Sequence, residues 1–340
     1  MFDTSRAISG NSVTPHFAVA TERMDNAVTV VVFVNPSAGA GKAARMIAPV
    51  RRAFLTEGLA VEFLEPRSRE AFRAEVRRAV AAGRNKLVAM GGDGTLQLLV
   101  REAMNSPVDL GVIPAGGGND FAAALGIRGW EQAVRAIQGG KCRAVDVVRV
   151  KFSDGAEAVY LGGGGIGLDA QAARLAAGRF RKWPGRWRYL AAALAALYRY
   201  RGVAVEAEFP DSPLPRIRQQ ALVLAVLNTP SYGGGLRLAP AAQPDDGLLE
   251  FVMLGMLRWP EVVRLLFWLA VSGQLPKARE ERRQARLVRV LAPRGALFHG
   301  DGEILGSVPV EIEALPRAVS FLVPGAAPPS ESLAEVSNRD

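Results

Sequence analysis

A glycine-rich turn with one aspartate lies at residues 91–95, where the chain reads GGDGT. The apolar segment 87–90 before it is typical of a buried parallel strand, and Leu96 and Leu99 after it fall on one face of an expected helix. Glycines allow another group to approach the backbone closely. The first turn of a helix offers free N–H groups and a positive dipole end, which suit phosphate. The motif indicates phosphate binding, with a plain strand–helix turn as the alternative.

Two further glycine-rich turns also follow expected strands. They read NPSAGAGK at residues 35–42 and PAGGGND at residues 114–120. Ligands of an open parallel sheet bind beyond the carboxyl ends of its strands. We therefore expect the three turns to meet at one edge of a sheet.

The segments around these turns alternate between strand and helix patterns as far as about residue 150. This alternation predicts a doubly wound parallel α/β sheet with helices on both faces. Beyond residue 150 the chain changes to short β-rich segments, with helices expected at 189–200 and 260–272, which favours an antiparallel sandwich or barrel. Residues 1–28 and 325–340 have the composition of flexible ends.

The bulk composition narrows the class of protein. A chain of 340 residues usually forms two domains. The single cysteine, Cys142, excludes an internal disulfide framework, and with only two histidines the usual ligands of a zinc site are scarce. A net charge of +9 points to anionic partners such as nucleotide phosphates, anionic lipid or nucleic acid. A signal-peptide pattern and a bilayer-spanning segment are both missing, so we expect a cytoplasmic protein.

Five motifs occur in the order found in lipid kinases of the diacylglycerol kinase type, and residues 28–324 resemble that family. The motifs are NPSAGAGK (35–42), GGDGT (91–95), PAGGGNDFA (114–122), YGGGLRLAPAAQPDDGLL (232–249) and DGE (301–303). The family includes bacterial soluble diacylglycerol kinase and the eukaryotic sphingosine and ceramide kinases. Its reaction transfers the γ-phosphoryl group of ATP, with Mg²⁺, to a lipid hydroxyl.

The resemblance also implies a domain layout with the active site between two domains. An ATP-binding α/β domain like that of NAD kinase and phosphofructokinase is expected at 29–148, and a β-sandwich-like domain at 149–315. A final strand is expected at 316–324, in a position from which the chain could return to the first domain.

The same resemblance assigns residues to the nucleotide and to the catalytic magnesium. Asp93, Asp120 and Asp146 match the acidic positions around the metal, although Asp120 could be a helix N-cap and Asp146 a polar turn residue. The implied nucleotide-binding residues belong to the three glycine-rich turns and are Asn35, Pro36, Ser37, Gly39, Gly91, Gly92, Asp93, Gly94, Thr95, Gly117 and Asn119.

Glu303 matches the general base of the family, which takes the proton of the lipid hydroxyl. Asp301 is expected to support it, and Asp93 completes the implied catalytic set. The dipeptide Asp301-Gly302 is also a good hairpin signal, and the two interpretations do not exclude each other. A second, structural Mg²⁺ is implied with the Asp246 carboxylate and the carbonyls of Gln243 and Leu248, with a simple Asp-Gly turn as the alternative.

The chain departs from the family pattern at several nucleotide positions. Gly117 replaces a threonine, residues 64–70 lack another threonine, and residues 161–171 have glycine where relatives often carry asparagine. Two rival functions follow. One is an NAD kinase-like phosphotransferase, because it shares GGDGT, and the other is a non-catalytic nucleotide- or lipid-sensing protein.

Residues 179–201 combine seven Arg or Lys with five Trp or Tyr and no acidic residue. This composition suits an anionic membrane surface, so we expect peripheral membrane docking and a lipid substrate taken from that surface. The alternative is a core helix with solvated basic flanks, which we favour for residues 261–271. Nucleic-acid binding is not expected, since no recognition motif accompanies the charge. The sequence leaves open whether the chain forms a homodimer.

Overall fold

The computed structural model describes residues 30–139, 141–167, 202–256, 261 and 280–325. The expected membrane segment 179–201 and nearly all of 261–271 lie outside the described residues. Within the described part of the chain, no helix is both long enough and apolar enough to cross a membrane.

The first half contains a parallel sheet in the order β4-β3-β1-β2. Its strands are short and most are buried on both faces, as expected when helices cover both sides of a sheet. Their bounds are β1 (Val30–Val34), β2 (Val61–Leu64), β3 (Lys86–Gly91) and β4 (Asp109–Pro114).

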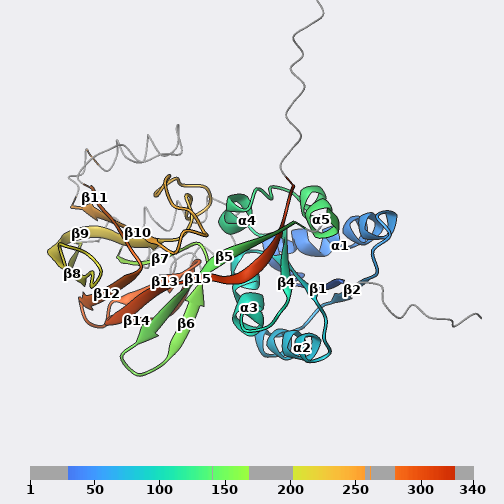
Figure 1. Cartoon of the computed structure of the whole chain (residues 1–340), viewed down its shortest axis with the longest axis horizontal. Coiled ribbons are helices and arrows are strands. Elements are labelled where there is room, and N and C mark those ends of the chain that lie inside the picture. Colours follow the sequence, from blue (N-terminus) through green and yellow to red (C-terminus); the bar gives the residue numbers. More distant parts are fainter. Residues whose placement is uncertain (1–29, 140, 168–201, 257–260, 262–279, 326–340) are drawn as a thin grey trace, which may run out of the picture.

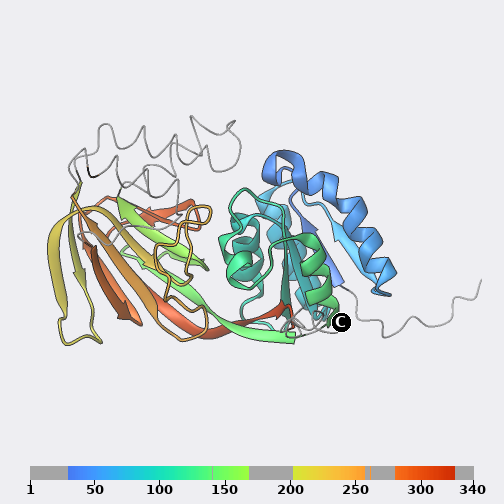
Figure 2. The same ribbon diagram turned by 90° about the horizontal axis from the view of Figure 1, so that it is seen from above.

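Helices cover the two faces of this sheet, α1 and α5 on one and α2 and α3 on the other (Figures 1 and 2). Each helix buries one apolar stripe, for example Val50 and Phe54 of α1. The helices are α1 (Ala38–Thr56), α2 (Arg69–Ala81), α3 (Asp93–Ala103), α4 (Asp120–Ala124) and α5 (Trp130–Gly139). This arrangement confirms the doubly wound fold predicted for the first half.

The second half is built from antiparallel strands, as the short β-rich segments predicted. They curve into a sandwich-like body beside the α/β half (Figure 2). The strands are β5 (Lys141–Phe152), β6 (Glu157–Tyr160), β7 (Gly163–Gly167), β8 (Val203–Glu208), β9 (Arg216–Leu227), β10 (Leu249–Gly255), β11 (Glu280–Ala285), β12 (Leu287–Ala292), β13 (Leu297–Gly300), β14 (Glu303–Ser307) and β15 (Val310–Val323).

Two long strands, β5 and β15, run through both halves (Figure 1). β15 pairs with β12 in the second half through residues 310–313 and with β4 in the first half at Ser320 and Phe321. The expected domain boundary at 148/149 falls inside β5, and the expected boundary at 315/316 falls inside β15. The two halves therefore share strands at both of these boundaries instead of being joined by loops.

The register of β15 against β5 shifts between Leu315 and Val319. Arg317, in this irregular stretch, has a positive φ of 51°. On one side of the bulge Ile312 and Ala314 pack in the core of the second half. On the other side Phe321 and Leu322 pack in the core of the first half. The bulge is thus where one strand passes from one core to the other.

Candidate functional site

The three glycine-rich turns lie together at the carboxyl edge of the parallel sheet. A Cβ atom on Gly39 would lie 2.2 Å from the carbonyl oxygen of Ala115, and one on Gly116 would lie 2.5 Å from the Cα of Gly92. Glycine is therefore required where the first turn meets the third and where the second meets the third. The expectation that the turns converge is confirmed.

The first turn, residues 35–41, is held to the second by side chains. Asn35 donates through Nδ2 to Oγ1 of Thr95 (3.1 Å) and accepts from Oγ of Ser37 (2.8 Å). A cavity of about 540 Å³ lies beside this turn. Its lining residues are Asn35, Pro36, Ser37, Glu65, Pro66 and Arg67.

Glu65 and Arg67, which follow β2 in the stretch that lacks the family threonine, were not predicted as site residues. They supply one acidic and one basic group to the wall of the cavity. The sequence feature that could have identified these two residues is their position directly after a strand of the parallel sheet, where ligands bind.

The second turn leads directly into α3. Gly92 is the N-cap, and Asp93 and Gly94 begin the helix, so the first backbone amides of α3 have no partner within the helix. The side chain of Thr95 packs so closely against Gly91 that a Cβ there would lie 2.4 Å from Oγ1. A bare backbone and the positive end of a helix dipole are thus presented at this edge.

The third turn is shaped by the side chain of Asn119, which has a positive φ of 62°. Its Oδ1 accepts from the amide of Gly116 (2.9 Å), and its Nδ2 donates to the carbonyl of Gly116 (3.0 Å). Asn119 is also the N-cap position of α4, so the N-cap role given as the alternative for Asp120 belongs to the residue before it. The neighbouring Gly117 is exposed.

Asp93 and Asp120 lie close together beside the third turn. A Cβ on Gly118 would lie 3.3 Å from Oδ2 of Asp93 and 3.6 Å from Oδ2 of Asp120. Asp93 accepts from the amides of Asn119 (2.9 Å) and Phe121 (3.4 Å). Burial, and next the negative charge of Asp120, raise the pKa of Asp93 above its ordinary value.

Asp120 reaches across to the second half of the molecule. Its two carboxylate oxygens accept from the amides of Gly234 and Gly235, each at 2.7 Å. Burial raises its pKa, while these two hydrogen bonds oppose the rise. The glycine-rich motif at 232–235 is therefore placed against the third turn.

Asp146 does not lie with these two aspartates, and the prediction that the three form one cluster is wrong. Its carboxylate accepts from the amides of Gly247 and Arg317, each at 2.7 Å. The reason is its place in β5 opposite the bulge of β15, which directs this side chain toward the 243–248 turn. Among the described residues, no three His, Cys, Asp or Glu side chains gather closely enough to hold a metal.

The 243–248 turn, expected as a structural metal site, is held by Asp146 and by its own side chains. Asp246 accepts from the amide of Leu248 (2.9 Å), and Asp245 pairs with Arg143 (2.8 Å). Gln243 is exposed beside them. The Asp-Gly turn given as the alternative is thus present, and a cavity of about 400 Å³ opens next to it, lined by Asp245, Asp246, Gly247, Arg286, Pro316 and Arg317.

Asp301 and Gly302 form the tight turn between β13 and β14. Both have positive φ, as a two-residue type I′ turn requires, so the hairpin predicted from the sequence is present. The Asp301 carboxylate accepts from the amides of Leu161 (2.8 Å), Gly162 (2.9 Å) and Gly163 (3.2 Å). Burial, and next the charge of Asp93, raise its pKa to about 7.

Glu303 begins β14 and projects from the second half onto the second glycine-rich turn. A Cβ on Gly94 would lie 2.8 Å from its Oε1. Arg69, the first residue of α2, donates to the same oxygen at 2.5 Å and also pairs with Oε2. Arg69 was not predicted as a site residue, because 234 residues separate it from its partner and no local pattern connects them.

The chemistry of this site follows from its parts. It combines helix-terminal amides, two adjacent carboxylates and a third, partly exposed carboxylate over the amides, at the rim between an α/β sheet and a β-rich body. Such a set can hold phosphates and place a base opposite them.

Comparison with known proteins agrees with this arrangement. Residues 29–150 match the diacylglycerol kinase catalytic domain, and residues 163–323 match the YegS C-terminal NAD kinase beta sandwich-like domain. A diacylglycerol kinase of Mycobacterium tuberculosis is 30% identical over 249 residues, which cover 72% of this chain and 79% of the relative. A YegS-like lipid kinase of Stenotrophomonas maltophilia is 29% identical, with 74% and 83% covered.

A crystal structure of a diacylglycerol kinase from Bacillus anthracis has the same fold, with a TM-score of 0.63 at 18% identity, covering 87% of this chain and 97% of that one. The first family match ends at residue 150 and the second begins at residue 163, close to the place where the structure changes from α/β to antiparallel β. The chain therefore belongs to the family of the diacylglycerol kinases and YegS-like lipid kinases.

Proposed function

We propose that this member of the lipid kinase family transfers the γ-phosphoryl group of ATP to the hydroxyl of a neutral lipid of the diacylglycerol or sphingosine type. The observation that carries the proposal is the position of Glu303. A carboxylate from the second half lies against Gly94, at the helix terminus best suited to phosphate.

The glycine-rich turns supply the phosphate-binding part of the proposal. The first amides of α3 lie at the carboxyl edge of the sheet, and Thr95 of the same turn accepts from Asn35, which lines the cavity. We assign this cavity to the nucleoside and the amides of the second turn to the phosphates. Binding of this kind holds the transferred group in line with its acceptor, which provides most of the catalysis in phosphoryl transfer.

Glu303 is assigned the role of general base. Its carboxylate is partly exposed, with 35% of the side chain open to solvent, so an acceptor hydroxyl can reach it. Accepting the hydroxyl proton leaves an alkoxide-like oxygen beside the phosphate-binding amides. Asp301, fixed by three backbone amides, holds the turn from which Glu303 projects.

Asp93 and Asp120 fit a magnesium ion in this proposal. Their carboxylates are neighbours, and the charge of Asp120 raises the pKa of Asp93, which is the electrostatic situation that a divalent cation would relieve. Mg²⁺ bound here would neutralise charge on the phosphates. Asp146, beside the 243–248 turn, is not assigned to it.

An assay of the purified chain with labelled ATP, Mg²⁺ and micelles containing diacylglycerol or sphingosine tests the proposal. We expect labelled lipid phosphate, and a rate lower by about 10²–10⁴ in Glu303→Gln, the range typical of a lost general base. Glu57→Gln, at the far end of α1, is the matched control and keeps the wild-type rate. A wild-type rate in Glu303→Gln would contradict the assignment.

The same assay separates the rival functions. NAD as acceptor would yield NADP if the chain were an NAD kinase-like enzyme, and the lipid kinase names of the relatives favour lipid instead. ATP binding in calorimetry with no turnover on any lipid would favour the sensing protein.

Peripheral docking on an anionic membrane is the part of the proposal that supplies the substrate. It depends on residues 179–201, whose seven basic residues each add about 1 kcal/mol of attraction near such a surface. Co-sedimentation with phosphatidylglycerol vesicles should exceed that with phosphatidylcholine and should weaken as salt is added. Equal binding to both kinds of vesicle would contradict the proposal that the chain docks on an anionic membrane.

A further inference from the structure

Arg69 and Glu303 face each other from the two halves of the molecule. Nη2 of Arg69 donates to Oε1 of Glu303 at 2.5 Å and also contacts Oε2. We propose that Arg69 is the positioning residue for Glu303, which it holds against the phosphate-binding turn when the two halves are docked. The proposal rests on the base role given to Glu303 above.

The stability of helix α2 does not explain why an arginine stands at this position. Arg69 is the first residue of α2, and Ser68 caps the helix by accepting from the amide of Ala71 (3.1 Å). The start of a helix carries the positive end of the dipole, so a cation there is unfavourable, whereas the acidic Glu70 beside it is favourable. Arg69 therefore opposes the local preference and serves a contact outside its own helix.

Stability does not account for the pair either. Of the Arg69 side chain 56% is exposed, and of the Glu303 side chain 35%. Ion pairs as open as this add little to the free energy of folding, because water and salt screen them. What the contact does supply is direction, since one guanidinium nitrogen meets both carboxylate oxygens.

Arg69 stands on an anchored helix. Helix α2 is tied to α3 through Arg73 and Arg77, which donate to the largely buried Glu102 at 2.5 and 2.6 Å. Glu303 begins β14, the strand at the end of the sheet order, whose one partner among the described strands is β13. Asp301 holds the turn of this hairpin, and Arg69 adds an attachment at the first residue of the edge strand.

Steady-state kinetics test the proposal. We expect Arg69→Ala to lower kcat by about 10- to 100-fold with a change in KM for ATP below about threefold, since the residue acts through the base. Arg69→Lys should recover part of kcat, and added guanidinium ion should partly rescue Arg69→Ala. When Arg69→Ala is added to Glu303→Gln, kcat should fall by less than about a further twofold, because both substitutions remove the same function.

Arg78→Ala is the matched control, on the same helix but away from the site. It breaks an exposed ion pair with Glu75 inside α2 and leaves the contacts of α2 with α3 in place, so it should leave kcat near the wild-type value. Wild-type kcat in Arg69→Ala, or full multiplication of the Arg69→Ala and Glu303→Gln losses, would overturn the proposal. A loss of kcat in Arg78→Ala as large as in Arg69→Ala would also overturn it.

Amide hydrogen exchange gives a second readout that needs no turnover. Arg69→Ala should speed exchange in the β13–β14 hairpin, residues 297–307, whereas Arg78→Ala should not. Unchanged exchange in the hairpin would overturn the positioning role even if no lipid were phosphorylated. Absence of lipid phosphorylation by the wild-type chain, with exchange behaving as expected, would instead contradict only the proposed function.

Discussion

Single residues decide whether the candidate base can meet the phosphate-binding turn. Gly94 has no side chain at the point where Glu303 arrives, and Asp301 fixes the hairpin that carries Glu303. Both residues are placed by backbone geometry, so small substitutions at them separate the effects on chemistry from the effects on folding.

Gly94→Ala should reduce activity while leaving the fold intact. The new Cβ would lie 2.8 Å from Oε1 of Glu303, so the flexible carboxylate must move away from the turn. Alanine also favours a helix over glycine by about 1 kcal/mol, so the melting temperature should stay or rise. Turnover and thermal unfolding check both expectations. Gly139→Ala in α5, where a Cβ meets nothing within 4 Å, is the control, and a fully active Gly94→Ala would contradict the placement of the base.

Asp301 should make stability depend on pH. Its pKa is raised to about 7 from an ordinary value of 3.8, chiefly by burial, so the folded chain holds a proton that the unfolded chain releases more easily. The resulting stabilisation is complete below about pH 4 and is lost as the pH rises through about 7. Urea unfolding at several pH values should show this decline. The decline should be smaller in Asp301→Asn, and an equal decline would contradict the assignment.

At the scale of elements, the sequence predicted the strands and helices of the first half and the meeting of the three glycine-rich turns, because hydrophobic periodicity and glycine spacing are local signals. It did not predict that Asp146 would face the 243–248 turn, since a bulge in β15, 171 residues away at Arg317, decides that contact. Nor did it predict the partner of Arg69. Contacts between residues far apart in the sequence cannot be predicted from the residues that surround either partner.

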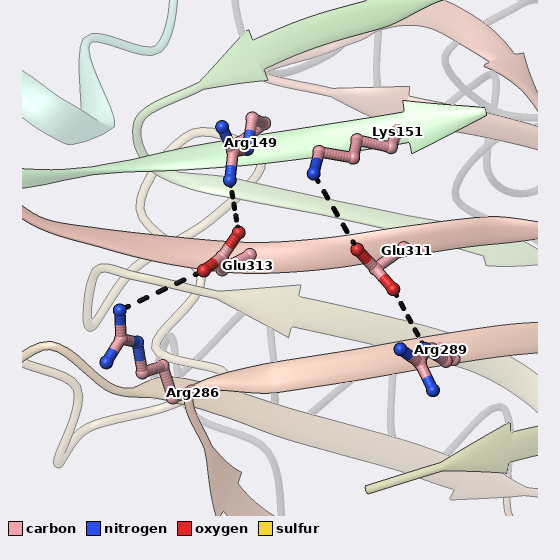
Figure 3. Close-up of polar contacts among 6 residues, drawn as sticks. All are labelled: Arg149, Lys151, Arg286, Arg289, Glu311 and Glu313. Atoms are coloured by element: carbon pink, nitrogen blue, oxygen red, sulfur yellow. Dashed lines mark hydrogen bonds and ion pairs between the residues drawn. The ribbon is translucent and has the colours of Figure 1, made fainter. Parts of the chain in front are cut away.

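The strands of the second half carry an ion-pair ladder that spans β5, β15 and the β12 region (Figure 3). Glu313 lies between Arg149 (2.5 Å) and Arg286 (3.9 Å), and Glu311 lies between Lys151 (4.0 Å) and Arg289 (2.8 Å). Each acidic residue of the middle strand thus neutralises cations on both sides. The ladder keeps this face of the sheet polar.

Glu313→Gln should destabilise the chain more than Glu311→Gln does. Arg149 is only 30% exposed, and its Nε is buried without a hydrogen bond, so loss of the Glu313 charge leaves a poorly solvated cation. We expect a loss of about 1–2 kcal/mol in the free energy of unfolding for Glu313→Gln and below about 1 kcal/mol for Glu311→Gln. Urea denaturation measures both values, and the reverse order would contradict the explanation.

At the scale of the whole molecule, three polar contacts among the described residues join the α/β half to the β-rich half near the site. Arg69 pairs with Glu303, Asp120 accepts from the 234–235 amides, and Gln97 of α3 donates to the carbonyl of Val159 in β6 at 2.6 Å. Only the last is buried, so it is the one expected to matter for stability.

Gln97→Leu should weaken this docking. The substitution keeps the side-chain volume but leaves the buried carbonyl of Val159 without its donor, which costs about 1–3 kcal/mol. Denaturant unfolding should show the loss, and amide exchange in β6 should rise. Gln132→Leu, in an exposed contact at the start of α5, is the control. Equal stability of Gln97→Leu and wild type would show that the contact is dispensable.

Strand β15 is the last described strand of the chain, yet it is paired with β4 in one half and with β12 in the other. During synthesis the α/β half must therefore wait for a neighbour of β4 that is made some 200 residues later. Neither core is complete until residues 310–323 have left the ribosome. Nascent chains stalled before this point should remain protease-sensitive throughout, and the two halves should become resistant together.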